Sequence, residues 1–414
     1  MKAHQTLILR ISRLFRLAVT LFLPALVVSL IACTAHAVSY TFTNIADSNG
    51  IFAPTEPMSG IGNGVLSINN SGMVAFGSGL DDGSFGVFEG NGGPITPIAL
   101  TTGPTFSLVG GGWINSAGTV GFFGSFKAGG QGVFTWKDGI TSTVVTTSDG
   151  FTSVGGGLIT DAGRVLFGAN GAGGSTGLVL RGGGQPPATV VVTSGSVFSD
   201  VIGASINGLG TVAFSAILDS GATGVFTGNG GATTTIGLVP FPQGMAPSIN
   251  DSGTVVFAAD SGSSVGRRIL MGNGGLLTTF VSASGPFSGF GIYPAINNGG
   301  TVAFLAGLDV INFEVREGLF TGPDPVADKV LISNDLLFGS RFVQFGGGTT
   351  QSLGALAIND FGQIAFHYQL ADGRQGIAVA TPTPEPTVTS MILIGVALLG
   401  YRRRVRAKDQ FNHN

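Results

Sequence analysis

The chain repeats one short pattern of polar and hydrophobic positions seven times. Six of the copies read isoleucine, asparagine, two variable residues, glycine, one variable residue and an apolar run that ends in phenylalanine, as in Ile68 to Phe76, and the third copy has threonine in place of the asparagine. Asparagine and glycine at this spacing favour a tight hairpin, and the apolar run favours a β-strand. The remaining copies are Ile114 to Phe122, Ile159 to Phe167, Ile206 to Phe214, Ile249 to Phe257, Ile296 to Phe304 and Ile358 to Phe366.

The spacing of these copies predicts the architecture. The turn glycines lie 43 to 47 residues apart, except for an interval of 62 before the last one. A third apolar run follows in each copy, and four dipeptides predict type I′ turns into a fourth strand. Four strands in about 45 residues is the size of one propeller blade. The four dipeptides are Asn91-Gly92, Asp138-Gly139, Asn229-Gly230 and Asn273-Gly274.

The two ends of the array complement each other. The seventh copy stops after Ile377 to Ala380 without a fourth strand, whereas Ser39 to Ile45 is a spare strand before the first copy. We therefore predict an all-β, seven-bladed β-propeller over residues 38–381, closed by the N-terminal strand. An open β-solenoid is the alternative, although a solenoid would not need complementary ends.

The repeated asparagines and glycines are predicted to be structural turn residues. The third copy has Thr160 in place of asparagine, which favours a role in turn formation over an essential chemical role. The predicted turn residues are Asn69, Gly72, Asn115, Gly118, Asn207, Gly210, Asn250, Gly253, Asn297, Gly300, Asn359 and Gly362.

Residues 1–37 have the organisation of a secretory signal. Four cations precede an apolar run from Leu17 to Ala32, and Ala35 and Ala37 form an A-x-A cleavage site. Cleavage there would start the mature chain at Val38. Cys33, the single cysteine, follows small and apolar residues as in a bacterial lipobox, so lipidation at Cys33 is the competing interpretation. Both routes export the protein.

Residues 382–414 form a tripartite tail. Pro384, Glu385 and Pro386 precede a largely apolar stretch from Val388 to Tyr401, and an arginine cluster of Arg402, Arg403 and Arg404 follows. A helix of about 14 residues spans roughly 21 Å, which is short of the ~30 Å hydrocarbon core and makes a marginal permanent anchor. A plain single-span anchor is the alternative to a sorting signal.

This tail resembles the PEP-CTERM sorting signal of Gram-negative bacteria that make exopolysaccharide. The resemblance implies a membrane exosortase as partner, transient membrane contact through the tail, and a final location at the cell surface or outside the cell. The tandem N-x-x-G-x-V-A-F repeats are similar to those of a group of exported bacterial repeat proteins.

Composition and charge narrow the candidate functions. Glycine makes up 71 of 414 residues and charged residues only 10%. Residues 38–381 hold ten Lys and Arg against 20 Asp and Glu, so the exported body is about ten charges negative. An acidic body without a basic stripe argues against nucleic acid as a partner.

Candidate catalytic chemistry is sparse. His367 is the one histidine of the body, which disfavours zinc sites and Ser-His-Asp triads. Trp113 and Trp136 interrupt the repeat, and we expect both to be buried. Acids are predicted in the loops between second and third strands, where they could bind cations or sugar hydroxyls: Asp81, Asp82, Asp219, Asp260, Asp309 and Asp372. No EF-hand spacing occurs, so calcium has no support beyond these acids, and we predict no cofactor, metal ligand or catalytic residue.

Two functions remain. The first is a non-catalytic binding or structural module associated with an exopolysaccharide matrix. The second is a propeller enzyme that acts on polysaccharide through acidic loop residues. For the second, the place to look is the insertion at residues 323–350, which carries Asp324, Asp328, Asp335 and Arg341.

Overall fold

The computed structural model describes residues 38–52, 66–192, 196–240, 245–260, 266–283, 285–311, 314–346 and 356–383. The chain divides into two units, Met1–Ala37 and Val38–Asn414, and the structure below belongs to the second. The predicted cleavage and lipidation residues (Ala35, Ala37, Cys33) lie outside the described residues. So do the predicted sorting residues (Pro384, Glu385, Pro386, Arg402, Arg403, Arg404). Among the described residues, no helix has the length and apolarity that a membrane span requires.

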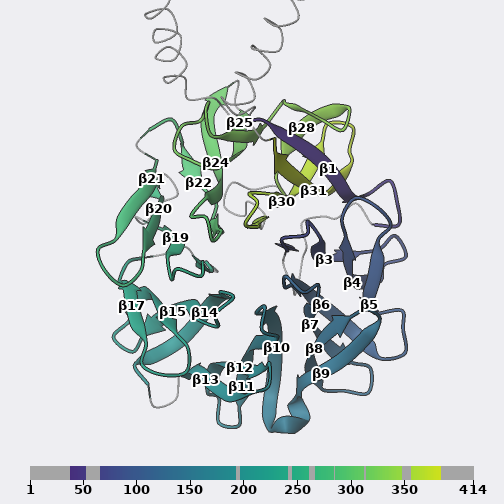
Figure 1. The fold of residues 1–414 in the computed structure, drawn as a ribbon, viewed down its shortest axis with the longest axis vertical. Coiled ribbons are helices and arrows are strands. Elements are labelled where there is room, and N and C mark those ends of the chain that lie inside the picture. Colours follow the sequence, from purple (N-terminus) through teal and green to yellow (C-terminus); the bar gives the residue numbers. More distant parts are fainter. Residues whose placement is uncertain are drawn as a thin grey trace, which may run out of the picture. The chain divides into compact units, whose positions relative to one another are not determined.

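Seven antiparallel sheets form a seven-bladed β-propeller around a central axis (Figure 1). In each blade, the innermost strand pairs with the strand that carries the Val-Ala-Phe run, and two more strands follow toward the outside. The fold class predicted from the repeat is confirmed.

The first four blades have four strands each. Blade one is β2 (Leu66–Ile68), β3 (Val74–Gly79), β4 (Phe85–Gly90) and β5 (Thr96–Leu100). Blade two is β6 (Phe106–Ile114), β7 (Val120–Phe126), β8 (Gln131–Lys137) and β9 (Ile140–Thr146), with a 3₁₀ turn at Thr147–Asp149. Blade three is β10 (Phe151–Ile159), β11 (Arg164–Gly171), β12 (Thr176–Gly182) and β13 (Gln185–Val192). Blade four is β14 (Phe198–Ile206), β15 (Val212–Leu218), β16 (Thr223–Gly228) and β17 (Thr234–Gly237).

The last three blades are less regular at their inner edges. Blade five is β18 (Ser248–Ile249), β19 (Val255–Ala259), β20 (Arg268–Gly272) and β21 (Thr278–Ser282). Blade six is β22 (Gly289–Phe290), β23 (Ala295–Ile296), β24 (Val302–Ile311), β25 (Glu314–Phe320) and β26 (Lys329–Ile332). Blade seven is β27 (Leu336–Leu337), β28 (Ser340–Gln344), β29 (Leu356–Ile358), β30 (Ile364–Leu370), β31 (Gln375–Pro382) and β1 (Tyr40–Asp47).

The N-terminal strand closes the ring, as predicted. Strand β1 is the outer strand of blade seven and pairs antiparallel with β31, with Tyr40 opposite Pro382 and Asp47 opposite Gly376. At the end of this pair, the Thr383 N–H donates to the Ser39 carbonyl at 2.8 Å. The Tyr368 hydroxyl on β30 also donates a hydrogen bond to Asn44 Oδ1 on β1 at 2.9 Å. Closure leaves neither end of the blade array as a free edge.

The phenylalanines of the repeat form the core between neighbouring sheets. Each of the seven is at most 1% exposed, and each belongs to an apolar cluster that joins its own blade to the preceding one. Within blades, rings stack or meet edge to face, as between Phe122 and Phe134 at 5.3 Å and between Phe214 and Phe226 at 5.7 Å. Burial of one such side chain contributes about 1.5–3 kcal/mol, so these phenylalanines stabilise the stacking of neighbouring blades.

The predicted type I′ turns form at one of the four dipeptides. Asp138 and Gly139 both have positive φ, 49° and 85°, and connect Lys137 directly to its partner Ile140. Asn91, Asn229 and Asn273 do not have positive φ. The prediction was wrong for these three because a longer connection joins their strands, as between Glu89 and its partner Thr96, and this removes the constraint of a two-residue loop.

The insertion before the last copy contributes strands rather than a separate lobe. Lys329–Ile332 is the outer strand of blade six, and Ser340–Gln344 pairs with the C-terminal end of β30. Because β29 pairs with the other end of β30, the inner strand of blade seven is made from two separate segments.

Candidate functional site

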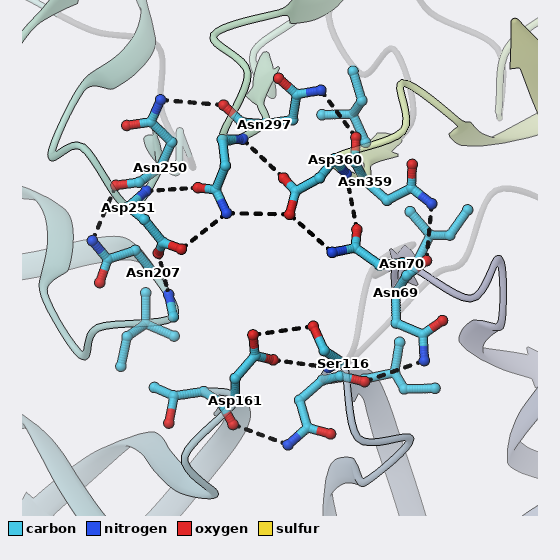
Figure 2. Close-up of a pocket in the computed structure, with 18 of the residues that line it drawn as sticks. Asn69, Asn70, Ser116, Asp161, Asn207, Asn250, Asp251, Asn297, Asn359 and Asp360 are labelled. Carbon is cyan, nitrogen blue, oxygen red and sulfur yellow. Dashed lines mark hydrogen bonds between the residues drawn. The ribbon is translucent and has the colours of Figure 1, made fainter.

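The mouth of the central channel is lined by the seven repeat hairpins. A cavity of about 180 Å³ lies there, and its walls are the isoleucine, the asparagine or threonine, and the following residue of each copy. Figure 2 shows side chains from successive hairpins pointing toward one another around this cavity. The site is therefore built from the motif that defines the repeat.

Each asparagine first holds its own hairpin. The Asn69 Oδ1 atom accepts hydrogen bonds from the backbone N–H groups of Ser71 and Met73, both at 3.0 Å. The Gly72 N–H donates to the Asn69 carbonyl at 3.0 Å, and Gly72 has φ +79°. The turn glycines of the other six copies have φ between +74° and +88°, where only glycine is unstrained. The side chain and the glycine together set the turn that the sequence predicts.

Each asparagine then uses its amide to bind the next blade. Asn69 Nδ2 donates to the Asn115 carbonyl at 3.2 Å, and the same bond recurs between other neighbours (Figure 2). All six asparagines are 4–5% exposed, so these bonds lie in a shielded environment. The others run from Asn115 to Thr160 (3.0 Å), Asn207 to Asn250 (3.0 Å), Asn250 to Asn297 (3.2 Å), Asn297 to Asn359 (3.0 Å) and Asn359 to Asn69 (2.9 Å).

Thr160 performs only one of these two tasks. Its Oγ1 accepts the Arg164 N–H at 3.0 Å, in the place of the asparagine Oδ1. Threonine has no amide, so no corresponding bond reaches the Asn207 carbonyl in blade four. The circuit of amide bonds is therefore continuous except between blades three and four.

A second polar layer lies at the residue that follows each asparagine. In five of the seven copies its N–H donates to the side chain of the corresponding residue in the next blade, as from Asn298 to Asp360 Oδ1 at 2.9 Å, whereas no such bond runs from Asn70 to Ser116 or from Asp161 to Gly208. The Asn298 amide also bridges two carboxylates, Asp251 Oδ2 at 2.9 Å and Asp360 Oδ2 at 3.2 Å. Similar N–H bonds run from Ser116 to Asp161 (2.8 Å), Gly208 to Asp251 (2.8 Å), Asp251 to Asn298 (2.8 Å) and Asp360 to Asn70 (2.9 Å).

The two layers are the feature that sequence reasoning missed. The asparagines were predicted only as turn formers, and Asp161, Asp251 and Asp360 were not singled out. A signal was available, because the position after the asparagine is polar or glycine in all seven copies. What it does depends on the neighbouring blade, which a single hairpin does not contain.

Three of the predicted loop acids make local contacts. Asp82 accepts hydrogen bonds from the Ser84 N–H and hydroxyl, which hold the pKa of this carboxyl below its usual value. Asp372 pairs with Arg374 at 2.8 Å, which also lowers its pKa. Asp260 lies 3.8 Å from Arg267. Asp309 lies within strand β24, so its placement in a loop was wrong; a bulge between Gly307 and Val310 extends the strand past it. Among the described residues, no three His, Cys, Asp or Glu side chains are arranged to hold a metal ion.

The acids of the insertion serve local structure. Asp324 Oδ1 accepts the N–H groups of Val326 and Ala327, and Asp328 Oδ2 accepts the Asp324 N–H. Asp335 pairs with Lys329 at 3.2 Å, and Arg341 donates to the Asn334 carbonyl at 3.4 Å. These contacts close turns and do not converge on a common point.

Four further residues that carry potential chemistry are wholly or partly buried. Trp136 is 8% exposed, and Trp113 is partly buried against the Gly157 backbone. Burial lowers the pKa of His367 on β30 to about 4. Glu317 on β25 is 7% exposed, and burial raises its pKa despite a hydrogen bond from the Phe345 N–H.

The chain is similar to one family model over a short segment and to several solved structures at low sequence identity. Residues 326–390 match the model of a family of unknown function, DUF7453. No curated protein matches the chain. An oligogalacturonate lyase from Vibrio parahaemolyticus is 13% identical over 84% of this chain and 98% of its own, with a TM-score of 0.49. The BP39L lectin from Burkholderia pseudomallei is 13% identical over the same shares, with a TM-score of 0.44. TolB from Acinetobacter baumannii is 12% identical over 57% of this chain, with a TM-score of 0.39, and the chain spans 60% of TolB, less than two thirds of its length. Each likeness concerns the fold alone.

Proposed function

We propose that this protein is an exported, non-catalytic propeller that is sorted to the cell surface through its C-terminal tail and binds or organises an exopolysaccharide matrix. A β-propeller is consistent with a binding or structural module. One observation carries the proposal: the repeated polar side chains at the channel mouth are hydrogen-bonded to the next blade. A side chain whose donors and acceptors hold two blades together is not free to transfer a proton or attack a substrate.

The boundaries of the propeller support the proposed processing. Cleavage after Ala37 would leave β1 complete, because β1 begins at Tyr40. Cleavage at Pro384 to Pro386 would leave β31 complete, because β31 ends at Pro382. Both events would therefore release a ring that is still closed. The exosortase and the matrix polymer are the partners that the proposal names.

Processing is tested by fractionating the native host and measuring the intact mass of the protein. We expect a chain that begins at Val38, ends near Pro386 and is found at the surface or in the medium. Replacing Pro384, Glu385 and Pro386 by alanine should retain the full tail in the membrane fraction. A wild-type chain that keeps Tyr401 to Asn414 in the membrane, or that begins with a lipidated Cys33, would contradict sorting.

Binding is tested with purified residues 38–383 and exopolysaccharide isolated from the host. We expect the polymer to sediment the protein without change in polymer length. The appearance of new reducing ends would instead establish the alternative, a polysaccharide-acting enzyme. Failure to co-sediment, with no cleavage, would reject matrix binding while leaving the sorting result intact.

A further inference from the structure

The seven interfaces between blades are not equivalent at the channel mouth. Six of them are bridged by the amide layer, and the exception is the interface between blades three and four, where Thr160 faces Asn207. Across every other interface, the carbonyl of the asparagine or threonine accepts both a turn N–H and an amide from the preceding blade. The Asn207 carbonyl accepts the turn N–H of Gly210 but no amide from blade three.

The second polar layer is interrupted at the same interface, and also between blades one and two, where the amide of Asn69 still bridges the blades. Gly208 has no side chain to accept the Asp161 N–H, although it stands between two carboxylates, Asp161 and Asp251. Asn298 stands between Asp251 and Asp360 in the same way, and its amide bridges them. Of the seven interfaces, all of whose hairpins are described, only that between blades three and four lacks both layers.

One pair of facing apolar residues is also less buried there. Leu178 on β12 and Val201 on β14 face this interface and are only partly buried. The equivalent pair across the interface between blades one and two, Val87 and Val109, is 0% exposed on both sides. Across this interface both polar layers are therefore missing and one pair of facing apolar residues is less buried.

The closing strand does not make blade seven the weak point. Strand β1 pairs with β31 along its length, and Asn359 bridges blade seven to blade one. In a ring of seven, the interface between blades three and four lies opposite blade seven, as Figure 1 shows for β10 and β14 relative to β1 and β31. Rotation about that opposite blade separates two sheets without breaking any strand pairing.

From these observations we infer that the ring opens reversibly at the interface between blades three and four, with blade seven as the hinge. Local opening follows the interface with the fewest stabilising contacts, because its free-energy cost is lowest. The inference does not depend on the proposed function.

Thiol labelling of the native protein tests this inference. Ala216 and Ala306 are equivalent residues of blades four and six, both are 0% exposed, and each faces the preceding blade. Residues 38–383 contain no cysteine, so a single introduced thiol reports on one interface. Under native conditions we expect Ala216→Cys to react at least tenfold faster than Ala306→Cys, because labelling requires the interface to open.

Two substitutions that add the missing hydrogen-bonding groups, called repairs below, extend the test. Thr160→Asn supplies the missing side-chain amide, and Gly208→Asn supplies an amide that can bridge two carboxylates as Asn298 does. A Cβ at residue 208 would lie 3.1 Å from Asp251 Oδ1, so that carboxylate has to shift by a few tenths of an ångström. In the doubly repaired protein we expect the labelling of Ala216→Cys to slow at least tenfold and that of Ala306→Cys to stay unchanged. Each repair is also made singly, so that one that does not fold leaves the other as a test.

Two results would overturn the inference. Equal labelling rates of Ala216→Cys and Ala306→Cys in the otherwise unchanged protein would show that the interfaces open alike. An equal slowing of both thiols by the repairs would show that they stabilise the whole ring and not this interface.

Discussion

The side-chain amide of Asn359 donates a hydrogen bond to the carbonyl of Asn69 at 2.9 Å, although the two residues lie 290 positions apart. The same side chain accepts the Gln363 N–H at 2.9 Å within its own hairpin. One asparagine thus folds a turn with its oxygen and joins the last blade to the first with its nitrogen. This division of labour recurs around the ring and leads to the first prediction.

Asn297→Thr should remove the bond between blades six and seven while keeping the turn. Thr160 shows that threonine can accept the backbone N–H four residues on. We expect a loss of about 1 kcal/mol in the free energy of unfolding, the usual net value of one buried hydrogen bond. Urea unfolding measures it. Asn297→Ala, which also removes the turn acceptor, should cost more, and equal losses for the two variants would contradict the division of labour.

Ser205→Ala should not destabilise the protein. The Ser205 hydroxyl on β14 is buried without a hydrogen-bond partner, so alanine relieves a desolvation cost. We expect the free energy of unfolding to stay level or rise by about 1 kcal/mol. Ser67 is the matched control, because its Oγ accepts the Ile114 N–H at 3.1 Å in the neighbouring blade. Ser67→Ala should lose about 1 kcal/mol. The prediction fails if Ser205→Ala is the more damaging change.

Gly121→Ala should be severely destabilising. A Cβ at residue 121 would lie 1.9 Å from the Gly157 carbonyl oxygen of the next blade, and this backbone atom cannot move without separating two sheets. We expect a loss of about 3 kcal/mol and a lower melting temperature in calorimetry. Gly155→Ala is the control, since nothing lies within 4 Å of its added Cβ. Similar losses for both would show that chain entropy and not blade contact governs these glycines.

The stability of the propeller should fall as His367 is forced to bind a proton. Burial lowers the pKa of His367 to about 4, from 6.5 in the unfolded chain, so its stabilising contribution is complete above pH 6.5. That contribution decreases as the pH falls from 6.5 toward 4, because the unfolded chain binds the proton more tightly. Between pH 7 and pH 5 we expect a loss of about 2 kcal/mol in urea unfolding. His367→Gln should reduce the pH dependence over this window, and a variant with the full dependence would falsify the assignment to His367.

Most of the fold could be predicted from the sequence because the repeat encodes it locally. The Asn-x-x-Gly turn and the apolar run each act within about nine residues, so seven copies at a period near 45 predict seven blades. The spare strand at Ser39 to Ile45 predicted closure because a missing strand and an extra one are visible without coordinates. Less predictable were the outer hairpins, where Asn91-Gly92 and Asp138-Gly139 read alike but connect strands at different registers.

The sequence predicted the turns of the candidate site but not the contacts between its blades. The sequence by itself determined which atoms close each turn, because a side-chain oxygen and a glycine with positive φ act on their own backbone. Only the tertiary structure decided where the asparagine amides and the carboxylates of Asp161, Asp251 and Asp360 point. Their partners lie 43 to 62 residues away, or 290 at the closure of the ring, and face them only once the blades are stacked. The weak interface between blades three and four arises in the same way. In the sequence Thr160 stands out only as a departure from the turn motif and Gly208 not at all, and their joint effect arises because stacking places both at one interface.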